Sequence, residues 1–217
     1  MKKIIGVVLR PDKNDTKRYV SKINDSIRIK LSSYDINLIG IIPKSSNLYL
    51  SDDEKSLDIE SLEEILEICD GVVMPGGYGP FDYDYKVVDY CYKNDIPLFG
   101  ICLGMQVMGE YLGGKLKKVS NQLVHHNKKI LHEARISRNS NLYEMIQSDI
   151  IYVNSRHQEM ITGLDKSYIA ARYCKQIEAV NEKSKRFFLG VQWHPEDMET
   201  NHANKIFDGF IDSIRKK

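Results

Sequence analysis

A cysteine lies where a predicted strand turns directly into a predicted helix, and its neighbours are small. The segment is residues 100–106, GICLGMQ, and it follows the apolar run at 96–99. A residue at such a turn takes a strained backbone conformation that needs small neighbours, which Gly100 and Gly104 supply. The thiol then lies at a helix N-terminus, where unpaired backbone N–H groups favour the thiolate, the nucleophilic form of cysteine. Cys102 is therefore our candidate nucleophile.

An activated cysteine normally has a histidine base that a third group orients. Residues 190–196, GVQWHPE, offer such a pair, because a strand should end at Pro195 with His194 at its end and Glu196 two residues on. A carboxylate that accepts a hydrogen bond from the imidazole fixes its tautomer and stabilises the imidazolium. A histidine or a glutamate alone is equally typical of an ordinary surface turn. Together with Cys102 they predict a catalytic triad.

Acyl transfer also creates an oxyanion, which needs preorganised hydrogen-bond donors. The candidates are the N–H of Leu103 and an N–H in the turn at 75–77, PGG, for which we choose Gly77. Such a turn usually only connects two elements. Its place after a predicted parallel strand favours a role at the site, with Gly76 beside the substrate.

Composition limits the classes of function. The chain has 217 residues, with 31 Lys plus Arg against 30 Asp plus Glu, and its net charge of +1 argues against a nucleic-acid surface. The length predicts a single domain over 1–217. Four separated cysteines form neither a metal motif nor a disulfide framework. The N-terminal run ends at Arg10 and is typical of a buried strand rather than a signal peptide, and no apolar run could span a membrane. We therefore expect a cytoplasmic protein.

The order of elements predicts the fold class. In the first half of the chain, predicted strands alternate with predicted helices. The strands are 4–9, 36–42, 71–74 and 96–99; the helices are 19–31, a short one that ends near residue 68, and 85–93. Such alternation predicts a mostly parallel central sheet flanked by helices, flavodoxin-like, with ligands at the carboxyl ends of its strands. After residue 114 we expect appended antiparallel strands and a final helix on the sheet; these are 115–119, 129–137, 150–153, 168–173, 177–181, 187–192 and the helix 200–215.

Four segments resemble class I (triad-type) glutamine amidotransferase domains in order and spacing. They are residues 74–77, 100–106, 113–116 and 190–196, so the resemblance extends over nearly the whole chain. It implies that Cys102 attacks a γ-glutamyl amide to form a glutamyl thioester, that His194 is the general acid and base, and that Glu196 orients it. It also implies that Gln106 helps to hold the glutamyl group. This chemistry requires neither a metal nor an organic cofactor.

A further segment, 153–158, VNSRHQ, is similar to standalone γ-glutamyl hydrolases related to γ-glutamyl-γ-aminobutyrate hydrolase, peptidase family C26. That similarity implies that Ser155, Arg156 and His157 lie beside the α-amino and α-carboxylate groups of the substrate. The chain departs from these hydrolases at Leu103, where they commonly have arginine.

Two functions follow, from different classes of protein. The leading hypothesis is a hydrolase that cuts the γ-glutamyl amide of a small metabolite and releases glutamate and an amine. The alternative is a glutaminase subunit that delivers ammonia to a separate synthetase, which the sequence 102–106, CLGMQ, also suits. A catalytically silent binding module is a third hypothesis, which the intact triad disfavours. The oligomeric state is left open, with a homodimer as one option.

Several residues favour an ordinary structural interpretation. His125 and His126 fall in a predicted loop and make no metal spacing, and His132 and His202 have no evident partner in the sequence. The tyrosines between 78 and 92 could form a substrate rim or simply pack. Arg10 could face the site or end a strand at the surface.

Overall fold

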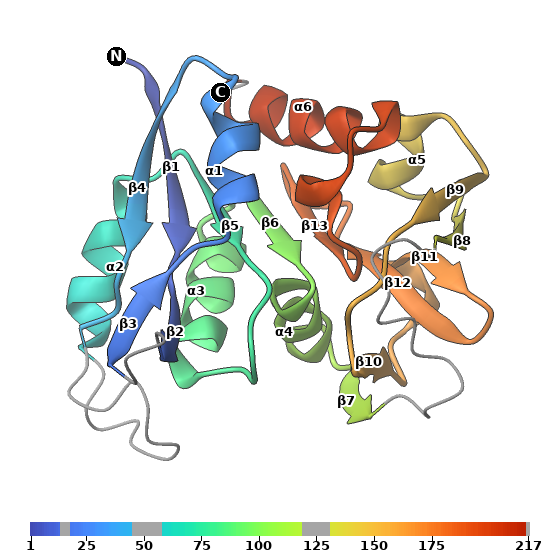
Figure 1. Ribbon diagram of the computed structural model, residues 1–217, viewed down its shortest axis with the longest axis horizontal. Coiled ribbons are helices and arrows are strands. Elements are labelled where there is room, and N and C mark those ends of the chain that lie inside the picture. The colour runs from blue at the N-terminus through green and yellow to red at the C-terminus, as the bar shows by residue number, and fades with distance from the viewer. Residues whose placement is uncertain (14–17, 45–57, 119–130, 216–217) are drawn as a thin grey trace.

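A nine-stranded sheet runs through the computed structural model, which describes residues 1–13, 18–44, 58–118 and 131–215. The strand order is β4-β1-β5-β6-β13-β12-β11-β8-β9 (Figure 1). The parallel strands are β4 (Ile36–Ile41), β1 (Lys3–Val8), β5 (Gly71–Met74), β6 (Leu98–Ile101) and β13 (Phe188–Val191). The antiparallel strands are β12 (Gln176–Asn181), β11 (Ile169–Tyr173), β8 (His132–Ile136) and β9 (Ile150–Val153). This confirms the predicted α/β fold class.

Helices cover both faces of the sheet (Figure 1). One face carries α1 (Asp25–Ser32), α5 (Asn141–Ile146) and α6 (Asn201–Arg215), and the other carries α2 (Ile59–Glu67), α3 (Asp82–Lys93) and α4 (Leu103–Tyr111). Two-stranded ribbons join β2 (Arg10–Lys13) to β3 (Tyr19–Lys22) and β7 (Lys115–Lys118) to β10 (Glu159–Thr162). The 3-10 turns are η2 (Lys166–Tyr168) and η3 (Pro195–Asp197). No described helix is both long and apolar enough to cross a membrane.

The central strands separate two hydrophobic cores. In β5, Val73 belongs to the core under α1 and α6, whereas Val72 and Met74 belong to the core under α2, α3 and α4. Successive side chains of a strand point to opposite faces, so a strand covered on both sides is apolar throughout. Phe99 of β6 packs against Phe207 of α6 with ring centroids 5.4 Å apart. The uninterrupted apolar runs of the sequence thus reflect burial on both faces.

Three predicted elements differ from the structure. Residues 19–31 were expected to form one helix, but 19–22 form β3 and the helix begins at Asp25. Asn24 caps this helix, because its Oδ1 accepts a hydrogen bond from Ser26 N at 3.2 Å. Residues 115–119 were expected among the appended strands, but β7 pairs with β10 outside the main sheet. β13 was expected to be antiparallel to the core, yet it pairs in parallel with β6.

The direction of β13 determines where the predicted site forms. Gly100 is paired with Gly190 and Ile101 with Val191. Since the two strands run in the same direction and in register, the residues that follow them leave the same edge of the sheet. An antiparallel β13 would have taken His194 to the opposite edge. The parallel pairing therefore brings the candidate nucleophile and the candidate base together.

Cys102 occupies a strained turn between β6 and α4. Its φ is 53° and its ψ is −101°, in a region that residues other than glycine rarely adopt. Its backbone N–H donates to Val191 O at 2.8 Å, which ties the turn to β13. A Cβ on Gly104 would lie 2.3 Å from Met74 O, and a Cβ on Gly100 would lie 2.7 Å from the carbonyl carbon of Gly104. The small neighbours expected from the sequence thus allow α4 to start directly against β5.

Gly104→Ala should destabilise the fold, because the new methyl group would collide with a backbone carbonyl rather than with a movable side chain. We expect a loss of about 2 kcal/mol in the free energy of unfolding, measured by urea denaturation. Gly209→Ala is the matched control, since its Cβ would meet the flexible end of Met145 and alanine favours the helix by about 1 kcal/mol. Equal losses in the two variants would contradict the explanation.

Candidate active site

The carboxyl ends of four parallel strands converge on one cavity. Arg10 follows β1, Gly76 follows β5, Cys102 follows β6 and His194 follows β13, and all four line a cavity of about 480 Å³. Ligand sites in open parallel sheets form at this edge, where adjacent connections leave in opposite directions. The ribbon β2–β3 supplies another part of the wall through Asp12, Lys22 and the residues that follow it.

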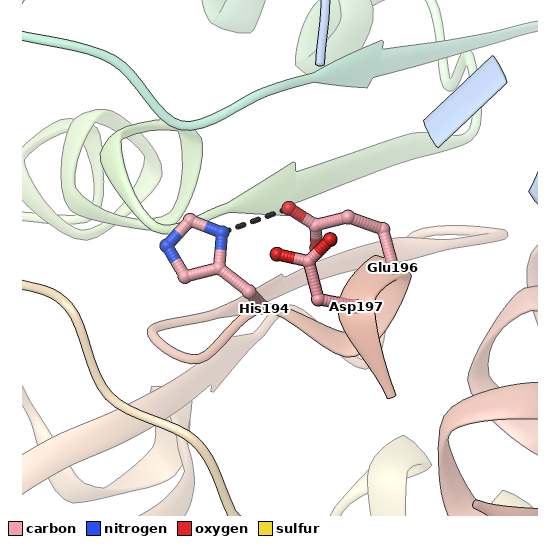
Figure 2. A group of neighbouring side chains, drawn as sticks. All are labelled: His194, Glu196 and Asp197. Carbon is pink, nitrogen blue, oxygen red and sulfur yellow. Dashed lines mark hydrogen bonds and ion pairs between the residues drawn. The ribbon is translucent and has the colours of Figure 1, made fainter. Parts of the chain in front are cut away.

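The imidazole of His194 is held between a thiol and a carboxylate. Its Nδ1 lies 2.8 Å from Glu196 Oε1. Figure 2 marks this hydrogen bond with a dashed line. A carboxylate only accepts, so Nδ1 carries the hydrogen and Nε2 is left as the nitrogen that we expect to exchange a proton with Cys102. His194 is 8% exposed and Glu196 is 4% exposed. The three predicted triad residues are thus brought together and largely withdrawn from water.

The site favours the protonated imidazole. Burial by itself lowers the pKa of His194, but the hydrogen bonds with Cys102 and Glu196, reinforced by their charges, raise it to about 9. An imidazolium beside the sulfur stabilises the thiolate and keeps a proton ready for a leaving group. The arrangement is suited to nucleophilic attack by sulfur followed by proton donation from His194.

A side chain that was not singled out from the sequence fixes the backbone of the base. Asn154 follows β9, its Nδ2 donates to His194 O at 2.9 Å, and its Oδ1 accepts from His194 N at 2.8 Å. Both polar backbone groups of His194 are therefore satisfied by one buried amide. The sequence offered one indication of this role: Asn154 directly follows a predicted strand and lies three residues before His157.

The Pro-Gly-Gly turn lies against both reacting side chains. A Cβ on Gly76 would come within 3.0 Å of His194 Cε1 and 3.3 Å of Cys102 Cβ. A Cβ on Gly77 would come within 3.3 Å of Leu103 Cδ2. The two backbone donors that we expect to form the oxyanion hole, Gly77 N–H and Leu103 N–H, thus belong to neighbouring segments. Their role stays a prediction.

A buried ion pair supports this turn from behind. Arg10 pairs with Asp84 of α3, and both side chains are buried. The guanidinium also donates through Nε and Nη2 to Pro75 O, at 3.1 Å and 2.8 Å. Burial raises the pKa of Asp84, while the charge of Arg10 and the N–H of Phe81 counteract that shift. Arg10 therefore positions the turn rather than ending β1 in solvent, and no local pattern indicated Asp84.

Two glutamine side chains connect Cys102 to the ribbon β7–β10. Gln192 Nε2 lies 3.6 Å from Cys102 Sγ, and its Oε1 accepts from Gln106 Nε2 at 3.2 Å. Gln106 Nε2 also donates to Glu159 O at 3.0 Å. Gln106 was predicted to hold the glutamyl group. In the structure, the amide of Gln192 lies between the Gln106 side chain and the thiol of Cys102.

The residues predicted to contact the α-amino and α-carboxylate groups separate in the structure. Arg156 lines the cavity, where its Nη2 lies 2.5 Å from Asp197 and 3.8 Å from Glu196. Ser155 is buried beside it. His157 is not among the described residues that line the cavity, and its Nδ1 faces Glu159 O at 2.8 Å.

His194, Glu196 and Asp197 also form the kind of group that could ligate a metal ion. One potential ligand atom from each lies within 4.8 Å of the others (Figure 2). Each group already has a protein partner, since Glu196 binds His194 and Asp197 binds Arg156. We therefore interpret the cluster as the base with its supporting carboxylates.

Other candidates take structural positions. Tyr78 is 89% exposed at the edge of the cavity, whereas Tyr85 donates to Glu110 at 2.7 Å and Tyr92 packs on Phe188. His132 is buried on β8. His125 and His126 lie outside the described residues.

The comparisons with known proteins agree on one family. The family model described as "Glutamine amidotransferase class-I" matches residues 45–213. A subunit of the glutamine-hydrolyzing GMP synthase of Methanothrix thermoacetophila is 30% identical over 151 residues, which cover 69% of this chain and 79% of that protein. The chain spans only 27% to 29% of the length of longer curated relatives that it also matches.

Two solved structures share the fold. A protein from Thermoplasma acidophilum, described as a GMP synthase subunit, has a TM-score of 0.71 and 20% identity, covering 99% of this chain and 95% of that chain. The glutaminase domain of Trypanosoma brucei CTPS, solved with bound acivicin, also has a TM-score of 0.71, with 21% identity and coverage of 99% and 94%. At these identities the similarity shows the architecture alone.

Glu196→Gln should lower the pKa of His194, because the amide removes the negative charge that favours the imidazolium. We expect NMR of the imidazole to give a titration midpoint near pH 9 in the unmodified protein and a clearly lower one in the variant. A folded-state pKa above the ordinary 6.5 also means that the pair stabilises the fold fully below pH 6.5 and loses this effect as the pH rises through 9. Glu199→Gln, an exposed site, is the control; identical midpoints in all three proteins would contradict the assignment.

Asp84→Asn should leave a buried guanidinium without its counter-charge. We expect a loss of about 3 kcal/mol or more in the free energy of unfolding, measured by urea denaturation. Asp89→Asn is the control on the same helix, because its pair with Lys93 is exposed and should cost less than about 1 kcal/mol. Equal effects at the two positions would show that Arg10 does not depend on Asp84.

Proposed function

We propose that this chain, which belongs to the class I glutamine amidotransferase family, hydrolyses the γ-amide of glutamine through a thioester on Cys102. The observation that carries the proposal is the buried row formed by Cys102, His194 and Glu196 at the edge of the parallel sheet. The relatives support glutamine as the substrate, since the matched synthases are named for glutamine hydrolysis.

In the first half of the reaction, Cys102 Sγ attacks the γ-carbonyl carbon and the carbonyl oxygen becomes an oxyanion. Backbone N–H groups of Gly77 and Leu103 would stabilise that charge. The C–N bond then breaks, and His194 transfers its Nε2 proton to the departing nitrogen, which leaves as ammonia. The product on the protein is a γ-glutamyl thioester.

In the second half, His194 acts as a base. Its Nε2 takes a proton from water while the water oxygen attacks the thioester carbon. The C–S bond breaks, glutamate leaves and the thiolate is restored beside the imidazolium. Glu196 keeps the imidazole in the required tautomer in both halves.

The relatives also support the fate of the ammonia. The matched proteins of Picrophilus torridus and Methanothrix thermoacetophila are named as subunits of GMP synthase rather than as whole synthases. They favour a glutaminase subunit that works with a separate synthetase over a standalone γ-glutamyl hydrolase.

A specific observation keeps the standalone γ-glutamyl hydrolase as a second candidate. The wall of the cavity also contains Asp12, Lys22 and Asn24 of the ribbon β2–β3 and its continuation. These residues precede the matched region 45–213. A polar wall of this kind could accept an amine larger than ammonia on the departing side of the amide.

Cys102→Ala should abolish hydrolysis, because no other group supplies the nucleophile. We expect release of glutamate from glutamine to fall at least about 1000-fold, in an assay of glutamate with and without an added synthetase. Cys174→Ala, at an exposed cysteine, should retain the full rate. A wild-type rate in the Cys102 variant would refute the proposal.

A panel of γ-glutamyl compounds should then separate the two candidates. A glutaminase should prefer glutamine over γ-glutamyl amines and peptides, with kcat/KM stimulated by its synthetase. A standalone hydrolase should prefer an amide with a larger amine and should need no partner. The glutaminase candidate would be excluded if the larger amides were hydrolysed at least as fast as glutamine, both with and without the synthetase.

A further inference from the structure

Three ionisable side chains are buried together in the antiparallel half, behind the candidate site. Glu178 of β12 has no solvent exposure, and its Oε1 lies 3.5 Å from His132 Nε2 and 4.0 Å from His157 Nε2. The proposed hydrolysis uses none of them. A carboxylate buried in the interior is costly unless neighbouring groups compensate its charge. The cluster therefore requires an explanation of its own.

His157 links this carboxylate to the polypeptide beside the site. Its Nδ1 lies 2.8 Å from Glu159 O, and a carbonyl oxygen only accepts, so Nδ1 carries a hydrogen. Its Nε2 faces Glu178, and the contact is attractive only when a proton lies between them. Burial lowers the pKa of His157, and the charge of Glu178 partly opposes this effect. The imidazole is thus held by a hydrogen bond at Nδ1, while its Nε2 faces Glu178 at 4.0 Å, beyond hydrogen-bond distance.

The same carbonyl begins a directed series of hydrogen bonds that ends at the nucleophile. Glu159 O accepts from Gln106 Nε2 at 3.0 Å, which determines which end of that amide faces the carbonyl. Gln106 Nε2 then faces Gln192 Oε1 at 3.2 Å, so the Nε2 of Gln192 is the end directed at Cys102 Sγ, 3.6 Å away.

The direction of this series matters for the charge on sulfur. An amide N–H pointing at Sγ stabilises a thiolate, whereas an amide oxygen in that place would repel it. A glutamine amide can rotate by half a turn with little change in shape, and only its hydrogen-bond partners choose its orientation. The position of the Glu159 carbonyl therefore decides the polarity presented to Cys102.

We propose that Glu178 is a positioning residue for Cys102: through His157 it holds the Glu159 carbonyl, which orients the Gln106 and Gln192 amides toward the thiolate. His132, whose ring lies 4.6 Å from that of Tyr173, faces the same carboxylate oxygen, Glu178 Oε1, as His157 does. This inference deepens the proposed function. It concerns the reactivity of the sulfur, however, and can be tested without any γ-glutamyl substrate.

The test measures alkylation of Cys102 by iodoacetamide at pH 7, with the modified peptide quantified by mass spectrometry. Cys174→Ala is used as the background, so that no exposed cysteine competes. Glu178→Gln removes the charge but keeps the size, and His157→Asn keeps a donor near Nδ1 while losing the contact with Glu178. We expect each variant to react about tenfold more slowly, the order of effect of one lost hydrogen bond to a charged group.

Because the two changes interrupt one series, the double variant should react no more slowly than either single variant. Glu133→Gln, a half-exposed glutamate beside His132 on β8, should change the rate less than twofold. A purely structural role for Glu178 would lower the melting temperature and leave the rate unchanged. If Glu178→Gln fails to fold, His157→Asn alone carries the test.

Three outcomes would overturn the proposal: an unchanged rate in either folded single variant, a double variant in which the two effects multiply, or an equal effect of Glu133→Gln. Inactivation by acivicin provides a separate reading. If iodoacetamide reacts as expected but glutamine is not hydrolysed and acivicin has no effect, the proposed function fails while the positioning role of Glu178 stands.

Discussion

The backbone of Cys102 is the constraint on which the rest of the site depends. A positive φ at a residue with a side chain costs free energy, and it persists only where the surroundings impose it. Here the hydrogen bond to Val191 and the close approach of Gly104 to Met74 impose it from two sides. The backbone conformation therefore sets the position of the sulfur at the edge of the sheet. The other groups of the site are arranged around that position.

The second requirement is alignment between strands that are distant in sequence. β6 and β13 run in parallel and in register, which brings Cys102 and His194 to one edge without any adjustment of side chains. Polar side chains then fix the segments that follow the strands. Asn154 holds the backbone of His194, and the pair of Arg10 and Asp84 holds the Pro-Gly-Gly turn. Most of these groups are buried, so their hydrogen bonds compete little with water.

Local patterns in the sequence predicted the parts that depend on local physics. The apolar run of β5, the cysteine turn and the helix α6 follow from periodicity and small residues, and they were found. The direction of β13 was not predicted correctly, because the residues of a strand do not specify which strand it pairs with. Glu178 and Asp84 were also missed, because the role of each depends on contact with a residue that is distant in sequence. Asp84, for example, lies 74 residues from Arg10. The helical spacing of residues 19–31 predicts one helix, and the pairing of residues 19–22 with β2 cannot be inferred from that spacing.

The cavity joins two parts of the chain, one inside the region that the family model matches and one before it. Its catalytic side is formed by β5, β6 and β13, inside the region matched by the family, whereas β2, β3 and Arg10 precede that region. The start of the matched region therefore falls between two parts of the cavity wall. Arg10 belongs to the ribbon that forms this wall and also holds the turn beside the thiol, so a single guanidinium couples the outer wall mechanically to the reacting edge of the sheet.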